Sequence, residues 1–156
     1  MTSNDDCGST RSLERQRQRL VARSAKGILD DEQIRRLWKG VDIVGDIAIL
    51  RLPRELGGSK SLIAQNLLDI APCIKVVLEQ IGPVESLFRT RRLEWLAGEK
   101  RSETVHREFG CKYRVDLNAV YFSHRLSYER KRITDLVCPG ECVVNFFAGL
   151  GSFSVM

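Results

Sequence analysis

The chain is poor in the side chains that build metal sites, and it has no long apolar run. It holds only two histidines, and none of its five cysteines forms a CxxC pair. Structural zinc sites need four such ligands at short spacings, so we expect no metal. No stretch of about 18 apolar residues exists, which excludes a membrane-spanning helix. The polar start, Met1 to Ser12, also lacks the apolar core of a secretory signal.

The cysteines also bear on the cellular compartment. Their number is odd and their spacing irregular, which argues against a disulfide framework. We therefore expect reduced thiols and a cytoplasmic location. The formal net charge of +5 and the sequence pI of ≈ 9.1 favour anionic partners, with nucleic acid first among them.

Residues 1–40 are interpreted as a basic helical N-terminal segment. Arg11 to Lys26 (RSLERQRQRLVARSAK) combines high helix propensity with many arginines. Two interpretations stay open for it, namely a solvated helical face and a helix that contacts RNA. Asp30 followed by Gln33 has the spacing of a capping pair, which predicts that a short helix begins here.

Residues 41–117 are interpreted as a mixed α/β domain. Val41 to Leu52 is rich in β-branched residues around Gly45-Asp46, which predicts a strand, a turn and a second strand. Apolar residues at helical spacing from Leu62 to Leu68 predict a helix that Pro72 ends. Further strands are predicted over Ile74 to Leu78, over Ser86 to Leu96 with a basic face, and over Thr104 to Glu108 and Lys112 to Leu117 as a hairpin.

Residues 118–156 are interpreted as the beginning of a second domain. Ser127 to Val137 predicts a helix that buries Ile133, Leu136 and Val137. Cys142 to Phe146 is a fully apolar run of the kind that parallel sheets bury, so a strand is predicted there. A glycine turn follows it, and we expect another helix to begin near Ser152.

The glycine turn, Ala148-Gly149-Leu150-Gly151, is the strongest sign of chemistry. Glycines accept positive φ and lack Cβ, so the backbone can approach a ligand closely. The N–H groups of a helix that begins here would point at that ligand. Glycine turns also join strands to helices where no ligand binds. The apolar strand and the aromatic pair Phe146-Phe147 around the FAGxGxF spacing favour a cofactor loop.

A second candidate lies in YFSHRLSYERKRI, residues 121–133. On a helix, Arg125 and Glu129 would share a face, because they are four residues apart. One interpretation is a surface salt bridge, which stabilises by well under about 1 kcal/mol. The other makes Glu129 a proton acceptor and the arginines anion binders, since they stand just before the predicted cofactor strand.

Read in order, several segments of the chain resemble the tRNA (guanine-37-N1)-methyltransferase family of archaeal and eukaryotic type. The resemblance implies an α/β fold, in which a small mixed α/β domain is followed by the incomplete beginning of a Rossmann-like methyltransferase domain. It implies an enzyme that transfers methyl from S-adenosyl-L-methionine to N1 of the guanine 3′ of the anticodon, with tRNA as partner and a monomeric state. The segments are VDIVGDIAILRLP, FRTRRLEWLAGE, ETVHREFGCKYRVDL, VYFSHRL followed by Glu129-Arg130, and NFFAGLGSFSV.

The resemblance also implies roles for individual residues. Glu129 matches the family's general base, which removes the N1 proton, and Arg89 matches the arginine that stabilises negative charge on O6. Arg125 matches an arginine that braces this pocket. The implied cofactor-binding residues are Arg130, Asn145, Phe147, Ala148, Gly149 and Gly151.

Two departures from the family pattern affect these expectations. Asn145 stands where the family usually has an aspartate, so an anion near the cationic cofactor is lost. Only the first strand of the methyltransferase sheet is present, so we expect a fragment that is inactive alone. Two alternatives stay open: a non-catalytic tRNA-binding remnant, and the related aminocarboxypropyl transferase of wybutosine synthesis.

Overall fold

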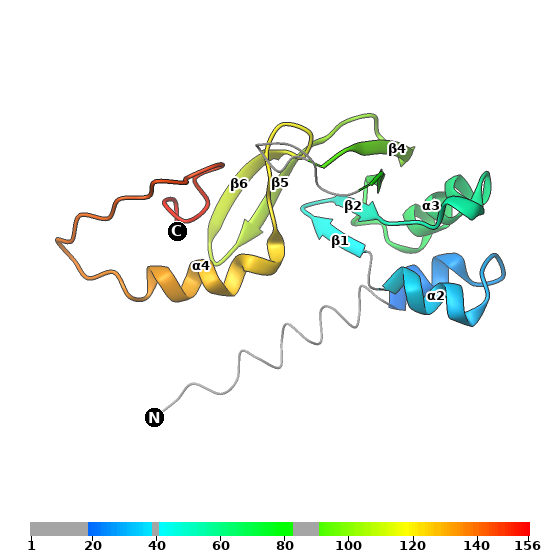
Figure 1. Cartoon of the computed structure of the whole chain (residues 1–156), viewed down its shortest axis with the longest axis horizontal. Coiled ribbons are helices and arrows are strands. Elements are labelled where there is room, and N and C mark those ends of the chain that lie inside the picture. The colour runs from blue at the N-terminus through cyan, green and yellow to red at the C-terminus, as the bar shows by residue number, and fades with distance from the viewer. Residues whose placement is uncertain (1–18, 39–40, 83–90) are drawn as a thin grey trace, which may run out of the picture.

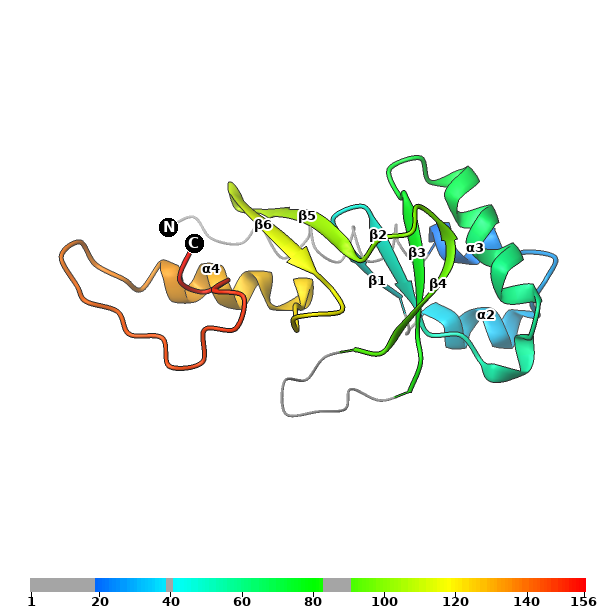
Figure 2. The same ribbon diagram turned by 90° about the horizontal axis from the view of Figure 1, so that it is seen from above.

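The computed structural model describes residues 19–38, 41–82 and 91–156. A four-stranded sheet stands at its centre, with helices against one face and a two-stranded hairpin against the other (Figure 1, Figure 2). In chain order the elements are α2 (Asp31–Trp38), β1 (Val41–Val44), β2 (Ile47–Leu50), the 3-10 helix η1 (Arg54–Leu56), α3 (Ser59–Ile70), β3 (Val76–Gln80), β4 (Leu93–Gly98), β5 (Glu103–Glu108), β6 (Cys111–Asp116), the 3-10 helix η2 (His124–Leu126) and α4 (Ser127–Thr134).

Two helices before the sheet lie within the ranges where the sequence predicts helix. Residues 19–25 are helical, and α2 follows them. Asp30 and Gln33 cap α2 reciprocally: the Gln33 N–H donates to Asp30 Oδ1 at 2.7 Å, and the Asp30 N–H donates to Gln33 Oε1 at 3.1 Å. The predicted capping pair is therefore confirmed. None of the helices in the described part of the chain is long and apolar enough to cross a membrane.

The sheet has the order β1-β2-β3-β4, and its two central strands are parallel. β1 and β2 form the predicted antiparallel pair around Gly45-Asp46, and α3 connects β2 to β3. Every residue of β2 and β3 is buried, because helices cover one face and the hairpin covers the other. The third predicted strand is displaced, since β3 occupies 76–80. β4 begins at Leu93, and residues 83–90 lie outside the described part.

Two apolar cores lie on opposite faces of the sheet. On the helix face, Ile63 and Leu67 of α3 pack with Leu50 and Val77. On the hairpin face, Tyr113 and Val115 of β6 pack with side chains from β2 and β3, together with Phe122. The mixed α/β fold predicted for residues 41–117 is confirmed, and the division of the whole chain at residues 40 and 117 stays a prediction.

The predicted hairpin of β5 and β6 is also confirmed. Its turn residues Phe109 and Gly110 have φ of 45° and 83°, the left-handed values that tight hairpin turns need. The hairpin meets the β1–β2 turn so closely that a Cβ on Gly45 would lie 2.1 Å from Thr104 Oγ1. A glycine at position 45 is therefore required for the two turns to pack.

The helix predicted over 127–137 is shorter than expected. α4 ends at Thr134, and Leu136 and Val137, which were predicted to be buried, are exposed. Their amides form only turn-like hydrogen bonds to residues three positions earlier. No described element packs over these two side chains, so burial does not favour a further helical turn. The side chain that α4 does bury is Arg130.

The strand predicted over Cys142 to Phe146 is wrong. Residues 141–145 are described and adopt neither helix nor strand, and only turns follow them, so the helix predicted near Ser152 is absent too. The exposed fractions of Val144, Phe146 and Phe147 are 66%, 86% and 95%. A strand exists through hydrogen bonds to a neighbouring strand, and no described residue offers one here.

Candidate functional site

α4 and the C-terminal segment, residues 135–156, line an open cavity of ≈ 970 Å³. Glu129 lies on its helical side, and Asn145 and Phe147 lie on its far side, so three of the predicted site residues meet there. The remainder of the lining is mostly apolar and comes from the same two segments: Ile133, Thr134, Val137, Cys138, Pro139, Val143, Val144, Phe146, Phe153, Ser154 and Met156.

Glu129 is exposed and ion-paired within its own helix. Its two carboxylate oxygens accept from Arg132 Nε at 2.9 Å and from Arg132 Nη2 at 2.7 Å. This hydrogen bonding lowers the pKa of Glu129, so the group is ionised at neutral pH. The carboxylate is thus in the form that can accept a proton, although Arg132 weakens it as a base.

Arg125 does not pair with Glu129, contrary to the shared helical face that the sequence suggested. Arg125 belongs to η2 rather than α4, so the four-residue helical spacing does not apply. Its Nε and Nη2 donate to Oδ1 of Asp42 in β1, at 3.0 and 2.7 Å. Arg125 therefore joins the entry of α4 to the first strand of the sheet.

Among the predicted site residues that the structure describes, Arg130 is the most deeply placed, with 1% of its surface exposed. Its guanidinium forms a two-pronged ion pair with Glu108 of β5 and donates to the Ser123 carbonyl oxygen. It also lies 5.0 Å from the ring centre of Phe122 and 6.0 Å from that of Phe153. Arg130 thus fastens α4 to the hairpin and contacts Phe153, at the end of residues 145–154, which we call the glycine segment.

Glu108 is itself held by two side chains, those of Arg130 and His106. Burial alone would raise the pKa of Glu108, but hydrogen bonds from His106 and Arg130 outweigh burial and lower it. His106 Nε2 lies 3.4 Å from Glu108 Oε2, and His106 Nδ1 accepts the Gly45 N–H at 3.1 Å. A chain of polar contacts therefore runs from the β1–β2 turn through His106 and Glu108 to Arg130.

The glycine segment docks on β6 through few contacts. The Tyr113 hydroxyl donates to the Ser152 carbonyl at 3.2 Å, and Leu150 packs against the core on the hairpin face. Gly149 and Gly151 have φ of 53° and 79°, and a Cβ on either would meet nothing within 4 Å. These two positions combine left-handed backbone with open space beside it. Ala148 and both glycines lie outside the lining of the ≈ 970 Å³ cavity.

Asn145 orders its own segment. Its Oδ1 accepts the Phe147 N–H at 3.2 Å, and its Nδ2 donates to Ser154 Oγ at 3.1 Å. The amide thereby ties the start of the segment to its end, across the glycines. Arg89, the remaining predicted site residue, lies outside the described residues.

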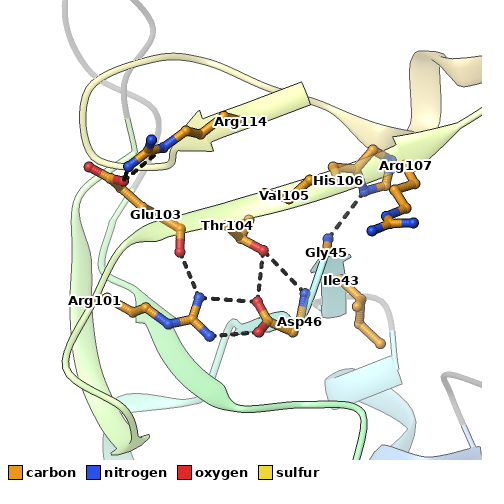
Figure 3. A pocket seen from close by; sticks show the side chains of 10 residues that line it. All are labelled: Ile43, Gly45, Asp46, Arg101, Glu103, Thr104, Val105, His106, Arg107 and Arg114. Carbon is orange, nitrogen blue, oxygen red and sulfur yellow. Dashed lines mark hydrogen bonds and ion pairs between the residues drawn. The ribbon is translucent and has the colours of Figure 1, made fainter. Parts of the chain in front are cut away.

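A second cavity, of ≈ 830 Å³, opens where the β1–β2 turn meets β5 (Figure 3). Arg101 donates to both oxygens of Asp46, at 3.1 and 2.6 Å, and Thr104 Oγ1 donates to Asp46 Oδ1 while accepting the Asp46 N–H (Figure 3). Hydrogen bonding from Arg101 lowers the pKa of Asp46. Because these charges neutralise one another, we interpret this cavity as a joint between the sheet and the hairpin.

Sequence reasoning gave no role to His106, Glu108 or Asp42. A signal was available for the first two. A hairpin with one buried face should carry apolar residues at alternate positions, yet the inward positions of β5 are Thr104, His106 and Glu108. Buried polar side chains need partners, so this pattern indicates a polar contact such as the one with Arg130. Asp42 offered a similar signal within the apolar run of β1.

Two protein-family models match adjacent parts of the chain. The model of the TYW2 N-terminal domain matches residues 21–101, and the model of the TRM5/TYW2 methyltransferase domain matches residues 104–156. The two matches meet at the start of β5, so nearly all of the hairpin, together with α4 and the glycine segment, falls in the second.

Three known proteins extend this comparison. Trm5b, a tRNA (guanine(37)-N(1))-methyltransferase of Pyrococcus abyssi, is 39% identical over 126 residues, which are 80% of this chain and 38% of that protein. Its crystal structure superposes with a TM-score of 0.71 at 37% identity, covering 85% of this chain and 41% of that one.

The other two are solved complexes. The complex of aTrm5 with tRNALeu has a TM-score of 0.69 and 40% identity, covering 74% of this chain and 34% of that one. Pyrococcus horikoshii TYW2 in complex with MeSAdo has a TM-score of 0.62 and 30% identity, covering 88% and 47%. The chain thus spans less than half the length of each relative. Sequence and fold agree, and the chain belongs to the TRM5/TYW2 methyltransferase family.

Proposed function

We propose that this chain carries the proton-accepting side and the first cofactor loop of a tRNA methyltransferase that modifies N1 of guanine 37. The observation that carries the proposal is the meeting of Glu129 with Asn145 and Phe147 around one cavity, in a chain of this family. The relatives named for this reaction support the choice of acceptor. The tRNA complex of aTrm5 supports tRNA as the partner, and the four described cysteines, all free, agree with a cytoplasmic location.

Glu129 would act as the general base. Its ionised carboxylate faces the cavity and can accept the N1 proton of a guanine placed there. Arg132 donates to both carboxylate oxygens, and we expect this ion pair to open as Glu129 meets the base. Opening removes the hydrogen bonds that lower the pKa of Glu129, and the carboxylate becomes a stronger base as it becomes free.

The arginines would act on the negative charge that proton loss leaves on the base. Arg89 is proposed to bind O6. Arg125 is proposed to brace the pocket from η2, because it is fixed to Asp42 rather than to Glu129. Arg130 supports the glycine segment through Phe153, and its predicted contact with the cofactor stays a prediction.

The residues present fit S-adenosylmethionine. Gly149 and Gly151 have open space beside their backbone, and the apolar walls near Phe147 suit an adenosine. Asn145, Phe147, Ala148, Gly149 and Gly151 would hold the cofactor, which supplies the methyl group when bound. The complex of P. horikoshii TYW2 with MeSAdo supports an adenosine ligand in this family. Asn145 brings no charge to the site.

A chimera tests the proposal. This chain, followed by the part of P. abyssi Trm5b that lies beyond the matched residues, should methylate N1 of guanine 37 in a tRNA transcript. Glu129→Gln should lower the single-turnover rate by about 10²- to 10⁴-fold without abolishing tRNA binding, because glutamine keeps the shape but accepts no proton. Arg89→Ala should slow the same step.

Arg114→Gln in the same chimera is the control, since Arg114 pairs with Glu103 on the hairpin, away from the cavity. Its rate should stay within about twofold of the parent, because it makes no contact that forms in the transition state. A Glu129→Gln rate equal to the parent rate would remove Glu129 from the mechanism. An inactive parent chimera that still binds tRNA would favour the non-catalytic remnant.

A second candidate is the transfer of an aminocarboxypropyl group in wybutosine synthesis. The observation that favours it is the match of residues 21–101 to the TYW2 N-terminal domain. Mass spectrometry of the modified nucleoside separates the two, because an aminocarboxypropyl group is much heavier than a methyl group. We favour methyl transfer, since P. abyssi Trm5b is the more similar of the two named enzymes.

A further inference from the structure

Three arginines converge on one buried carboxylate, that of Asp42 in β1. Arg125 donates to its Oδ1 at 3.0 and 2.7 Å, and Arg91 Nη1 donates to its Oδ2 at 2.8 Å. Arg51 Nη2 lies 3.8 Å from the same Oδ2, and Arg51 Nε donates to Gln80 at 3.2 Å. We call these four residues, Asp42 with Arg51, Arg91 and Arg125, the arginine cluster.

Positive charge exceeds negative charge in the arginine cluster. Burial alone would raise the pKa of Asp42, but Arg91 and then Arg125 outweigh burial and lower it, so Asp42 carries one negative charge. Three guanidinium groups remain positive at any physiological pH. One carboxylate therefore leaves an excess of two positive charges. Glu79 of the central strand β3 pairs with Lys60 of α3 rather than with these arginines.

The excess charge is available to a ligand. The side chains of Arg51 and Arg125 are 47% and 50% exposed, whereas Arg91 is 8% exposed and lies beneath. A guanidinium has five N–H donors, and Arg125 uses only Nε and Nη2 on Asp42. The terminal nitrogens of Arg51 and Arg125 can therefore donate outward while Asp42 holds both side chains in place. Fixed, paired guanidinium groups suit an oxyanion with several acceptor oxygens.

We propose that the arginine cluster binds a phosphate of the RNA backbone. The proposal rests on the proposed function in one respect, namely that RNA is the substrate. Arg51, which no catalytic role engages, would be its outer contact. The overall charge of +5 makes a polyanion the favoured ligand over a small free anion.

The arginine cluster lies close to the helix that carries the proposed base, so a phosphate bound there would position the RNA. Its members come from β1, from the residue after β2, from the approach to β4 and from η2. Arg125 in η2 stands four residues before Glu129 in α4. An RNA phosphate fixed here would hold the backbone beside the helix that carries the proposed base, so that binding at the arginine cluster positions the nucleotide for proton transfer.

Salt titration of RNA binding by the 156-residue chain tests the proposal. With a tRNA transcript, Arg51→Gln should weaken binding about three- to tenfold and lower the slope of log Kd against log salt by about one, the loss of one phosphate contact. The matched control is Arg114→Gln, which removes the same charge from an exposed arginine paired one-to-one with Glu103. It should leave the slope within error of the parent.

Each outcome decides something. Thermal unfolding of Arg51→Gln should match the parent, since Arg51 is half-exposed, and an unchanged midpoint ties the loss of affinity to the contact. Equal slopes for the parent and Arg51→Gln would overturn the proposal while leaving the proposed function intact. Competition by inorganic phosphate at low millimolar concentration would mean a small-anion site and would also overturn it. No RNA binding at any salt would overturn both, whereas an inactive chimera with normal binding overturns only the catalytic proposal.

Discussion

Two apolar runs of this chain differ in structure: one is a buried strand and the other is exposed and forms no strand. β2, Ile47–Leu50, is fully buried, with β1 on one edge and β3 on the other. Residues 143–147, VVNFF, are comparably apolar, yet they form no strand, and their large side chains face solvent. The difference lies in neighbours rather than in composition, because the described residues supply strand partners and covering helices to β2 and none to 143–147.

The comparison shows which contacts hold the C-terminal segment. It is attached through Arg130 and Phe153, through Tyr113 and Ser152, and through Leu150, rather than through a sheet. An exposed apolar surface of this kind is typical of a docking site for further structure. The central claim is that the sheet, with helices on one face and the hairpin on the other, is the packed part of the chain, whereas residues 141–148 have no strand partner among the described residues.

The largest expected effect concerns the ion pair that joins the two regions. Arg130→Leu leaves the buried Glu108 carboxylate without its guanidinium partner, and should lower the free energy of unfolding by about 3–5 kcal/mol. Urea denaturation followed by circular dichroism measures this. Arg132→Leu, two residues on, is the control: its pair with Glu129 is exposed, and its loss should change stability by at most about 1 kcal/mol. Equal effects would contradict the structural role of Arg130.

The next effect contrasts one apolar side chain from each region. Leu67 of α3 is fully buried, so Leu67→Ala should cost about 3 kcal/mol through lost burial and a cavity. Phe147 is 95% exposed, so Phe147→Ala should stay within about 0.5 kcal/mol. The same denaturation experiment compares them. A Phe147→Ala loss as large as that of Leu67→Ala would show that the C-terminal segment is packed in solution.

Gly45 gives a smaller effect at the joint between sheet and hairpin. A Cβ there would lie 2.1 Å from Thr104 Oγ1 and 2.8 Å from the Val105 carbonyl oxygen, in addition to the left-handed φ of 57°. Gly45→Ala should therefore cost about 2–3 kcal/mol. Gly110→Ala in the open hairpin turn meets only the φ penalty, about 1–2 kcal/mol. Thermal unfolding that ranked Gly110→Ala as the more damaging would contradict the close approach.

Acid should weaken the packed region progressively. Asp42, Asp46 and Glu108 have lowered pKa values, so the stability they contribute is fully present above the unfolded-state pKa of about 4 and is lost as pH falls through their folded values. The free energy of unfolding that these groups contribute should stay constant from pH 7 to about pH 5 and should decrease below about pH 4. Asp46→Asn should flatten part of that acid limb. If Asp46→Asn left the loss of stability below pH 4 unchanged, the ion pair between Asp46 and Arg101 would not contribute to it.

Local signals predicted the elements whose partners are close in the sequence. The capping of α2 by Asp30 and Gln33, the turn at Gly45 and the hairpin at Gly110 all depend on neighbouring residues, and all are confirmed. The strand at 142–146 was wrong because apolarity favours burial without supplying a partner strand. α4 begins at Ser127, as predicted, so Arg125 stands before it in η2, and the four-residue helical spacing to Glu129 does not apply.

The polar contacts of the site could not be predicted from the sequence, because their partners are brought together only by the tertiary structure. Asp42 and Arg125 are 83 residues apart, and Glu108 and Arg130 are 22 apart. Spacing along the chain does not reveal which carboxylate a given arginine meets. The resemblance picked out Glu129, Asn145 and Phe147, which do share a cavity, and left their supporting network unseen.

Hydrogen exchange of the 156-residue chain, read by mass spectrometry at peptide resolution, tests the central claim most directly. Amides of β2 and β3 should exchange slowly, through global unfolding, because both strands are paired on both edges. Amides of 141–148 should exchange near the rate of an unprotected peptide. Protection of 141–148 equal to that of β3 would contradict the account and show that this segment is paired in solution.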